Sequence, residues 1–247
     1  MSTQFQLVVI DLMCLVEGAG ETLTRMLRST LRAERIDVAP DDVRAVLGLP
    51  VRRATAALLQ TGMSLSASVE RSDRVHDAFL AEIGEHWTGR GSIREVDGAT
   101  AALCSLRAQQ LRIAIGTHLP RSVVDVILAN VGWYDRGLVD TSVTCDEVDD
   151  PRPHPGVILE AMRRTGLADA RRVLAMGETP ANLAEGTLAR CGAVVGVTSG
   201  LFRRDELELR PHTHLVGRVG DVLDVIAVHE TSKRGLELLD PRATAPA

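Results

Sequence analysis

The sequence predicts an α/β protein with a doubly wound, Rossmann-like parallel sheet and a helical domain inserted into it. Short apolar runs recur along the chain and alternate with stretches of helical spacing, which is typical of a parallel sheet buried on both faces. Between the first two runs lie about one hundred residues, far more than one crossover helix needs. The excess length predicts the inserted domain.

Five runs of apolar and β-branched residues are predicted to be strands. They cover residues 5–10, 111–115, 138–143, 173–176 and 193–197. Ligands of such sheets bind beyond the carboxyl ends of the strands, near the point where the strand order reverses. The residues directly after each run are therefore the first candidates for a functional site.

The region after the first run has helical spacing from Glu21 to about Trp87. The glycine-containing borders, Val16–Gly20 and Gly89–Gly98, are typical of hinge-like linkers. The end of the chain shows no periodicity. The predicted parts are an α/β core (1–16 and 96–230), a helical cap of the C1 type (17–95) and a disordered tail (231–247).

The composition argues against a nucleic-acid-binding, membrane-spanning or secreted protein. The 247 residues are 45% hydrophobic and 25% charged, with a formal net charge of −5 and no long basic run, which argues against a nucleic-acid partner. The sequence shows neither a bilayer-spanning apolar stretch nor a secretory signal. The four cysteines are scattered, which favours reduced thiols. We expect a cytoplasmic monomer or homodimer without a membrane partner.

Four polar residues follow the predicted strands and are expected to meet at one crevice. Asp11 follows the first run, Thr117 the second, Arg152 the third and Glu178 the fourth. Two carboxylates, a hydroxyl and a guanidinium suit attack on an electrophile that carries negative charge.

These motifs, in this order and with a helical insertion after the first, resemble those of the haloacid dehalogenase (HAD) superfamily. The segments RPHPGVILEAM and VLAMGETPANLAEG, and PHTH followed by a short apolar strand, are most similar to its phosphonatase-like branch. The resemblance covers nearly the whole chain. It implies a capped hydrolase that acts on a small anionic substrate.

The resemblance also implies a role for each candidate. Asp11 would be the nucleophile that forms a covalent intermediate, Thr117 would hydrogen-bond the transferred group, and Arg152 would position Asp11 and offset developing charge. Magnesium would be held by Asp11, Glu178 and the backbone carbonyl of Met13.

Several positions depart from the family pattern. The second acid of the first motif is replaced by Met13, whose thioether cannot transfer protons. Cys14 replaces the usual glycine, Glu178 stands where the family has Asp, and Asn182 replaces a further acid. These changes leave a degenerate, more apolar site with fewer magnesium ligands. Met13 and Cys14 are accordingly expected to contact the substrate.

The predicted cap departs from true phosphonoacetaldehyde hydrolases, which use a cap lysine to form a Schiff base. The only lysine here is Lys233, so that reaction is disfavoured. Arg52 and Arg53 lie near the expected position and could instead bind an anionic group. His118 and His154 are expected to face the crevice, where either could be a general base.

Three functions remain compatible with the residues. The first is a HAD-like hydrolase of phosphate- or phosphonate-type substrates with a covalent Asp11 intermediate. The second is a catalytically degenerate binding or regulatory protein, or an enzyme repurposed for specialised metabolism. The third is metal-independent displacement at carbon, as in dehalogenases.

Overall fold

The computed structural model, which describes residues 4–59, 65–87 and 93–239, has a parallel sheet at its centre. Its strands are β1 (Leu7–Asp11), β2 (Arg112–Gly116), β3 (Thr141–Val143), β4 (Val173–Gly177), β5 (Ala193–Val197) and β6 (His214–Val216). Their order is β3-β2-β1-β4-β5-β6, and every neighbouring pair is parallel. This is the doubly wound order, so the predicted fold class is confirmed.

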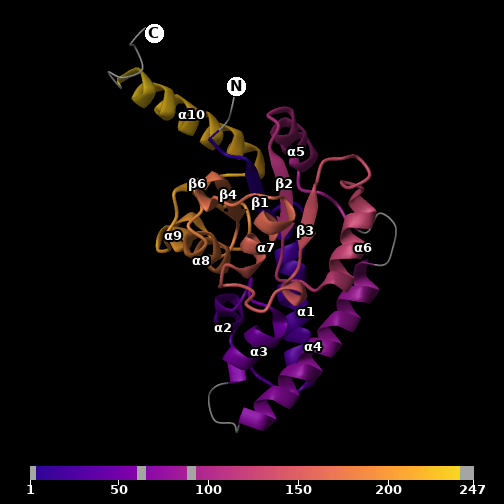
Figure 1. Ribbon diagram of the computed structural model, residues 1–247. Coiled ribbons are helices and arrows are strands. Elements are labelled where there is room, and N and C mark those ends of the chain that lie inside the picture. Colours follow the sequence, from indigo (N-terminus) through magenta and orange to yellow (C-terminus); the bar gives the residue numbers. More distant parts are fainter. Residues whose placement is uncertain (1–3, 60–64, 88–92, 240–247) are drawn as a thin grey trace.

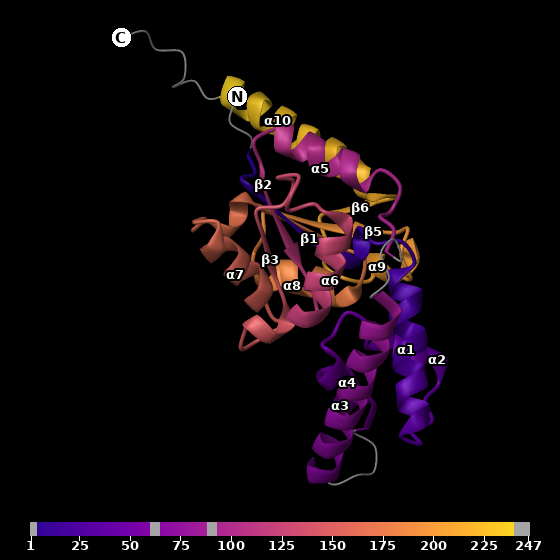
Figure 2. The same cartoon turned by 90° about the vertical axis from the view of Figure 1, so that its right-hand side faces the viewer.

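Helices cover both faces of the sheet and flank it at one end. They are α1 (Ala19–Ala33), α2 (Pro40–Ala45), α3 (Val51–Leu59), α4 (Leu65–Trp87), α5 (Ala99–Ala108), α6 (Arg121–Val131), α7 (Gly156–Arg164), α8 (Pro180–Leu188), α9 (Arg204–Glu208) and α10 (Val222–Leu239). We call α1 to α4 the helical insertion, since they lie between β1 and β2 in sequence. They extend away from one end of the sheet (Figures 1 and 2). No helix of the described segments is long and apolar enough to cross a membrane.

The central strand explains why the sheet is buried on both faces. All five residues of β1 are buried. Val8 and Ile10 belong to a core shared with α5, α6 and α10, whereas Leu7 and Val9 belong to a core shared with α7. Alternate side chains thus supply two cores, and the strand reads as a continuous apolar run.

The two chain segments that lead into and out of the helical insertion lie side by side. Val16 and Glu95 form an antiparallel bridge, and the Val96 amide donates to the Leu15 carbonyl at 2.9 Å. The predicted glycine-containing border 89–98 is described only from residue 93 onward, so its first part lies outside the described residues.

The helical insertion contacts the α/β core through α2 and the turn that follows it. The Arg44 guanidinium donates to the Leu201 carbonyl and pairs with Glu206 at 2.6 Å. Gly48 has a φ of +87°, and a Cβ built there would lie 2.4 Å from the Thr179 hydroxyl oxygen. The turn can approach α8 this closely because glycine has no side chain.

Two predicted boundaries need correction. The third strand begins at Thr141 rather than at residue 138, because the Leu138 amide bonds back to the Trp133 carbonyl in a turn. The predicted tail does not begin at residue 231, since α10 continues to Leu239. Good helix formers can extend a helix that is already nucleated without an apolar stripe. Residues 240–247 of the predicted tail lie outside the described residues.

Candidate active site

Asp11 is the last residue of β1 and is 1% exposed. The strand register places it beside Gly116, the last residue of β2. One carboxylate oxygen, Oδ1, accepts a hydrogen bond from Arg152 Nη1 at 3.1 Å. The other, Oδ2, is buried and has no hydrogen-bond partner among the described residues. One oxygen is held, and the other is available for chemistry.

Arg152 lies between two carboxylates and is 2% exposed. Its Nε donates to Glu185 Oε2 at 2.6 Å, while Nη1 donates to Asp11. We call Asp11, Arg152 and Glu185 the buried triad. Burial alone would lower the pKa of Arg152, but the charges of Asp11 and Glu185 have a larger, opposite effect. The net shift is upward, so the guanidinium stays protonated.

Thr117 and His118 come directly after β2. Thr117 is fully buried, and its hydroxyl oxygen accepts a hydrogen bond from the Leu119 amide at 3.2 Å. The hydroxyl proton therefore remains available for donation to a ligand. His118 is 7% exposed, and its Nδ1 has no partner among the described residues. Burial lowers the pKa of His118 to about 4, although the charge of Asp11 opposes this shift.

Glu178 follows β4 and lines a crevice of about 330 Å³ together with Met13, Cys14 and Gly200. Burial, and then the charge of Asp11, raises the pKa of Glu178 to about 7. A Cβ built at Gly200 would lie 2.4 Å from Glu178 Oε2, so this loop closely covers the carboxylate. Cys14 is buried too, and burial followed by the charges of Glu178 and Asp11 raises the pKa of its thiol.

The oxygen donors of Asp11 and Glu178 fit a hard divalent cation. Two carboxylates, Asp11 and Glu178, lie close enough for one to raise the pKa of the other, and Asp11 Oδ2 lacks a partner in the described chain. A cation would offset this concentrated negative charge. The described residues contain no group of three or more acidic, histidine or cysteine ligands. A magnesium ion, which keeps several waters, can be bound by one or two carboxylates.

Asn182 does not face the crevice as a ligand. Its side-chain oxygen accepts from the Thr179 amide at 3.1 Å and from the Thr179 hydroxyl at 2.7 Å. The Thr179 hydroxyl in turn accepts from the Asn182 amide at 3.3 Å, and Pro180 occupies the first turn of α8. This capping box fixes the start of α8 directly after Glu178.

The three remaining predicted residues make other contacts. Arg52 forms an ion pair with Asp73 of α4. Arg53 donates from Nη1 to the Pro151 carbonyl at 3.1 Å, so it links α3 to the loop that carries Arg152. None of the three, His154 included, lines the crevice beside Glu178. Of the predicted site residues, Met13, Cys14 and Glu178 line it, whereas the buried Asp11, Thr117, His118 and Arg152 are not among its lining residues.

The expectation for His154 is corrected. His154 is exposed and lines a separate hollow beside α7, together with Glu147 and Arg163. The segment before α7 is a turn, so residues two apart in sequence do not share a face as they would in a strand.

The sequence analysis did not identify Glu185. It lies in α8, seven residues after Glu178, and is 2% exposed. Within α8, Glu185 lies three and four residues after the buried Asn182 and Ala181, so it shares their helical face, and this spacing is the signal that could have found it. Burial raises the pKa of Glu185, whereas the hydrogen bond and charge of Arg152 lower it.

Comparisons with known proteins show which family the chain resembles in sequence and in fold. The profile of the haloacid dehalogenase-like hydrolase family matches residues 19–194. The chain is 26% identical over 181 residues to the "Probable phosphatase IndB" of Dickeya dadantii (strain 3937), covering 73% of this chain and 75% of that protein. It is 29% identical over 132 residues to a phosphonoacetaldehyde hydrolase of Bacteroides fragilis, covering 51% of this chain and 49% of the relative.

A solved structure is similar over almost the full chain. A phosphonoacetaldehyde hydrolase-like protein from Oleispira antarctica superposes with a TM-score of 0.76 at 14% identity, covering 94% of this chain and 95% of that one. This likeness concerns the fold. The family profile, which matches well over half of the residues, shows that the chain belongs to the haloacid dehalogenase-like hydrolase family.

Proposed function

We propose that this chain is a magnesium-assisted hydrolase that transfers a phosphoryl-type group from a small anionic substrate to Asp11. The observation that carries the proposal is the asymmetry of the Asp11 carboxylate. Arg152 holds Oδ1 at 3.1 Å, whereas Oδ2 is buried without a partner in the described chain. An oriented, desolvated carboxylate oxygen is suited to nucleophilic attack.

In the first step, Asp11 Oδ2 attacks phosphorus and the bond to the leaving oxygen breaks, so that its electron pair departs with the leaving group. The Thr117 hydroxyl, whose proton is free to be donated, stabilises the transferred group, and Arg152 keeps Asp11 in place. Asp11, Glu178 and the Met13 carbonyl would hold magnesium, which offsets negative charge on the transferred group when it is bound.

In the second step, water attacks phosphorus and releases Asp11. A base must accept a proton from this water. His118 is the candidate because its Nδ1 is buried and without a partner in the described chain, and because it is close enough for the charge of Asp11 to act on its pKa. Its pKa of about 4 keeps the ring neutral at pH 7 but makes it a weak base.

The first step has no obvious proton donor for the leaving group. Met13 occupies the position of the usual acid and is 3% exposed, so it also excludes water there. Leaving groups that are stable as anions should therefore react much faster than alkoxides. The curated relatives' names, a phosphatase and a phosphonoacetaldehyde hydrolase, agree with chemistry at phosphorus.

The test is turnover of p-nitrophenyl phosphate and hexyl phosphate with and without magnesium. We expect hydrolysis of the nitrophenyl ester, loss of activity with a chelator, and much slower hydrolysis of the alkyl ester. Mass spectrometry of acid-quenched protein should find phosphate on the peptide that contains Asp11. Phosphate on another residue, or turnover that a chelator does not reduce, would refute the mechanism.

A further inference from the structure

A second hollow, outside the crevice beside Glu178, is lined by three arginines of α1. Its volume is about 650 Å³, and Arg25, Arg28 and Arg32 contribute to its wall. Their spacings of three and four residues place them on one face of the helix. A further hollow of about 380 Å³ shares Arg28 and Arg32, so this basic face continues along α1.

These three arginines differ from many others in the described chain because their side chains make no hydrogen bond or ion pair with another described residue. By contrast, Arg121 and Arg164 each contact acids. Like charges three and four residues apart destabilise a helix, and Glu21, the acid that lines the same hollow, forms no ion pair with the three arginines in the described chain. An anionic ligand in the hollow would offset these charges.

The arginine hollow adjoins the active-site crevice, since Glu21 and Leu201 line both. Gly20 marks the crevice end of α1, because a Cβ built there would lie 3.3 Å from Glu178 Oε1. At a rise of about 1.5 Å per residue, Arg25 lies roughly 8 Å further along the helix axis and Arg32 roughly 18 Å. The near end of the arginine face is therefore within the span of a ligand that extends from Glu178 along α1.

The wall opposite α1 is held in place by contacts of α2. Arg44 donates to the Leu201 carbonyl, pairs with Glu206 and lies 5.0 Å from the centre of the Phe202 ring. Leu201, which lines both hollows, is thus held in place. A wall that is already ordered reduces the ordering cost of binding a ligand against it.

We propose that the arginine hollow binds a second anionic group of the substrate, so that the preferred substrate is an extended molecule with a reactive phosphoryl-type group at one end and a phosphate or carboxylate group at the other. The identity of the reacting end rests on the proposed function. The anion site itself rests only on Arg25, Arg28 and Arg32.

The test compares two ligands that differ only in the second anionic group, hexane-1,6-diol bisphosphate and hexyl phosphate. Their binding is measured by calorimetry in magnesium-containing buffer. The variant is Arg25→Gln/Arg28→Gln/Arg32→Gln. The matched control, Arg172→Gln/Arg190→Gln/Arg210→Gln, removes three charges from residues that line neither hollow.

We expect the wild type and the control variant to bind the bisphosphate at least about tenfold tighter than hexyl phosphate, as one or two charge-assisted contacts would produce. The α1 variant should bind the two ligands within about threefold of each other. Equal binding of the two ligands by the wild type, or an unchanged preference in the α1 variant, would overturn the proposal.

The same variants separate this proposal from the proposed function. If p-nitrophenyl phosphate is hydrolysed, the bisphosphate should inhibit the wild type more strongly than hexyl phosphate does, and the α1 variant should lose this difference while retaining its KM for the nitrophenyl ester. If no ester is hydrolysed, the proposed function fails. The calorimetric preference then still decides whether the anion site exists.

Discussion

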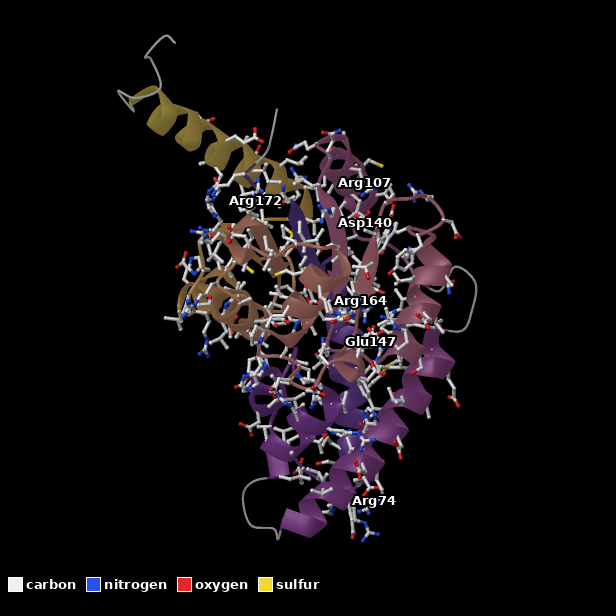
Figure 3. All side chains as sticks on the ribbon, in the orientation of Figure 1. Arg74, Arg107, Asp140, Glu147, Arg164 and Arg172 are labelled. Carbon is white, nitrogen blue, oxygen red and sulfur yellow. The ribbon has the colours of Figure 1, made fainter. Side chains whose placement is uncertain are left out.

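Arginine and carboxylate side chains meet at the same distance in two regions of very different exposure. In the buried triad, Arg152 contacts Glu185 at 2.6 Å, and both side chains are 2% exposed. In a network on the flank of the sheet, Arg121 contacts Glu147 at 2.6 Å with exposures of 29% and 27%. We call Arg121, Glu147, Glu160 and Arg164 the surface network. Figure 3 shows Glu147 and Arg164 close together beside α7.

Contact length does not set the energetic importance of an ion pair. Water screens the surface network, and an exposed pair contributes roughly 0–1 kcal/mol. Within the buried triad no water replaces a lost partner, so removing one carboxylate costs about 3–5 kcal/mol. The buried triad also carries more carboxylates than guanidinium groups, whereas Glu147 is contacted by two arginines. Four experiments exploit this contrast.

The largest effect should come from Asp11→Asn, which alters the reactive end of the buried triad. The amide keeps the shape of the side chain and an oxygen for Arg152, but it cannot attack phosphorus. We expect kcat for p-nitrophenyl phosphate to fall at least about a thousandfold, because the nucleophile is lost. The control is Asp125→Asn on α6, where the carboxylate is 64% exposed. Turnover within tenfold of the wild type would remove Asp11 as the nucleophile.

Glu185→Gln tests the other end of the buried triad. The neutral amide leaves Arg152 with Asp11 as its one remaining carboxylate contact in the described chain. We expect the free energy of unfolding, measured with urea, to fall by about 3 kcal/mol. A loss below 1 kcal/mol would show that the buried pair behaves like a surface pair, and the comparison would then be wrong.

Magnesium should distinguish the two regions by their charge balance. The crevice beside the buried triad has two mutually repelling carboxylates, whereas the surface network pairs its acids with arginines. Magnesium at about 100 times its Kd should raise the free energy of unfolding by about 2.7 kcal/mol. Glu178→Gln should abolish most of this gain. An equal gain in that variant would place the ion elsewhere.

The smallest effect should come from Glu147→Gln in the surface network. We expect less than about 1 kcal/mol of destabilisation at pH 7, because the pair is solvent-screened. Partial burial raises the pKa of Glu147, but the hydrogen bond from Arg121 and those within the Thr144 turn lower it to about 2 overall.

The pH dependence of that small effect has a defined sign. The folded pKa of about 2 lies below the ordinary value of 4.5, so the carboxylate stabilises the fold above pH 4.5. This contribution is lost as the pH falls from 4.5 toward 2. The difference between wild type and Glu147→Gln in urea unfolding should therefore shrink over this interval. A difference that grows on acidification would contradict the assignment.

The fold was predictable because the apolar runs of a doubly wound sheet are visible without knowledge of contacts. Val173 to Gly177, for example, is buried throughout and reads as one run. The third strand was predicted too long because Leu138 is buried in a turn, and burial alone does not distinguish a turn from a strand. The end of helix α10 was predicted too early, because its last residues have no apolar stripe that would indicate a helix.

Parts of the site were less predictable, because they depend on pairings between distant segments. Glu185 contacts Arg152 across 33 residues of sequence, and an acid within a helix is otherwise typical of solvent exposure. Arg52 has a partner, Asp73, that lies in the next long helix of the insertion. No spacing rule connects such residues. The positions after strands were predictable, whereas their partners were not.

The close seating of Gly48 on Thr179 has a consequence for protein engineering. Transplanting a helical insertion from another family member, as a route to new specificity, would bring a different residue to this turn. A side chain there would meet the Thr179 hydroxyl, where a Cβ would already lie 2.4 Å away. It would thereby push on the start of α8, directly after Glu178. Chimeras of this fold should therefore retain glycine where the graft contacts Thr179, the residue after the strand-end acid.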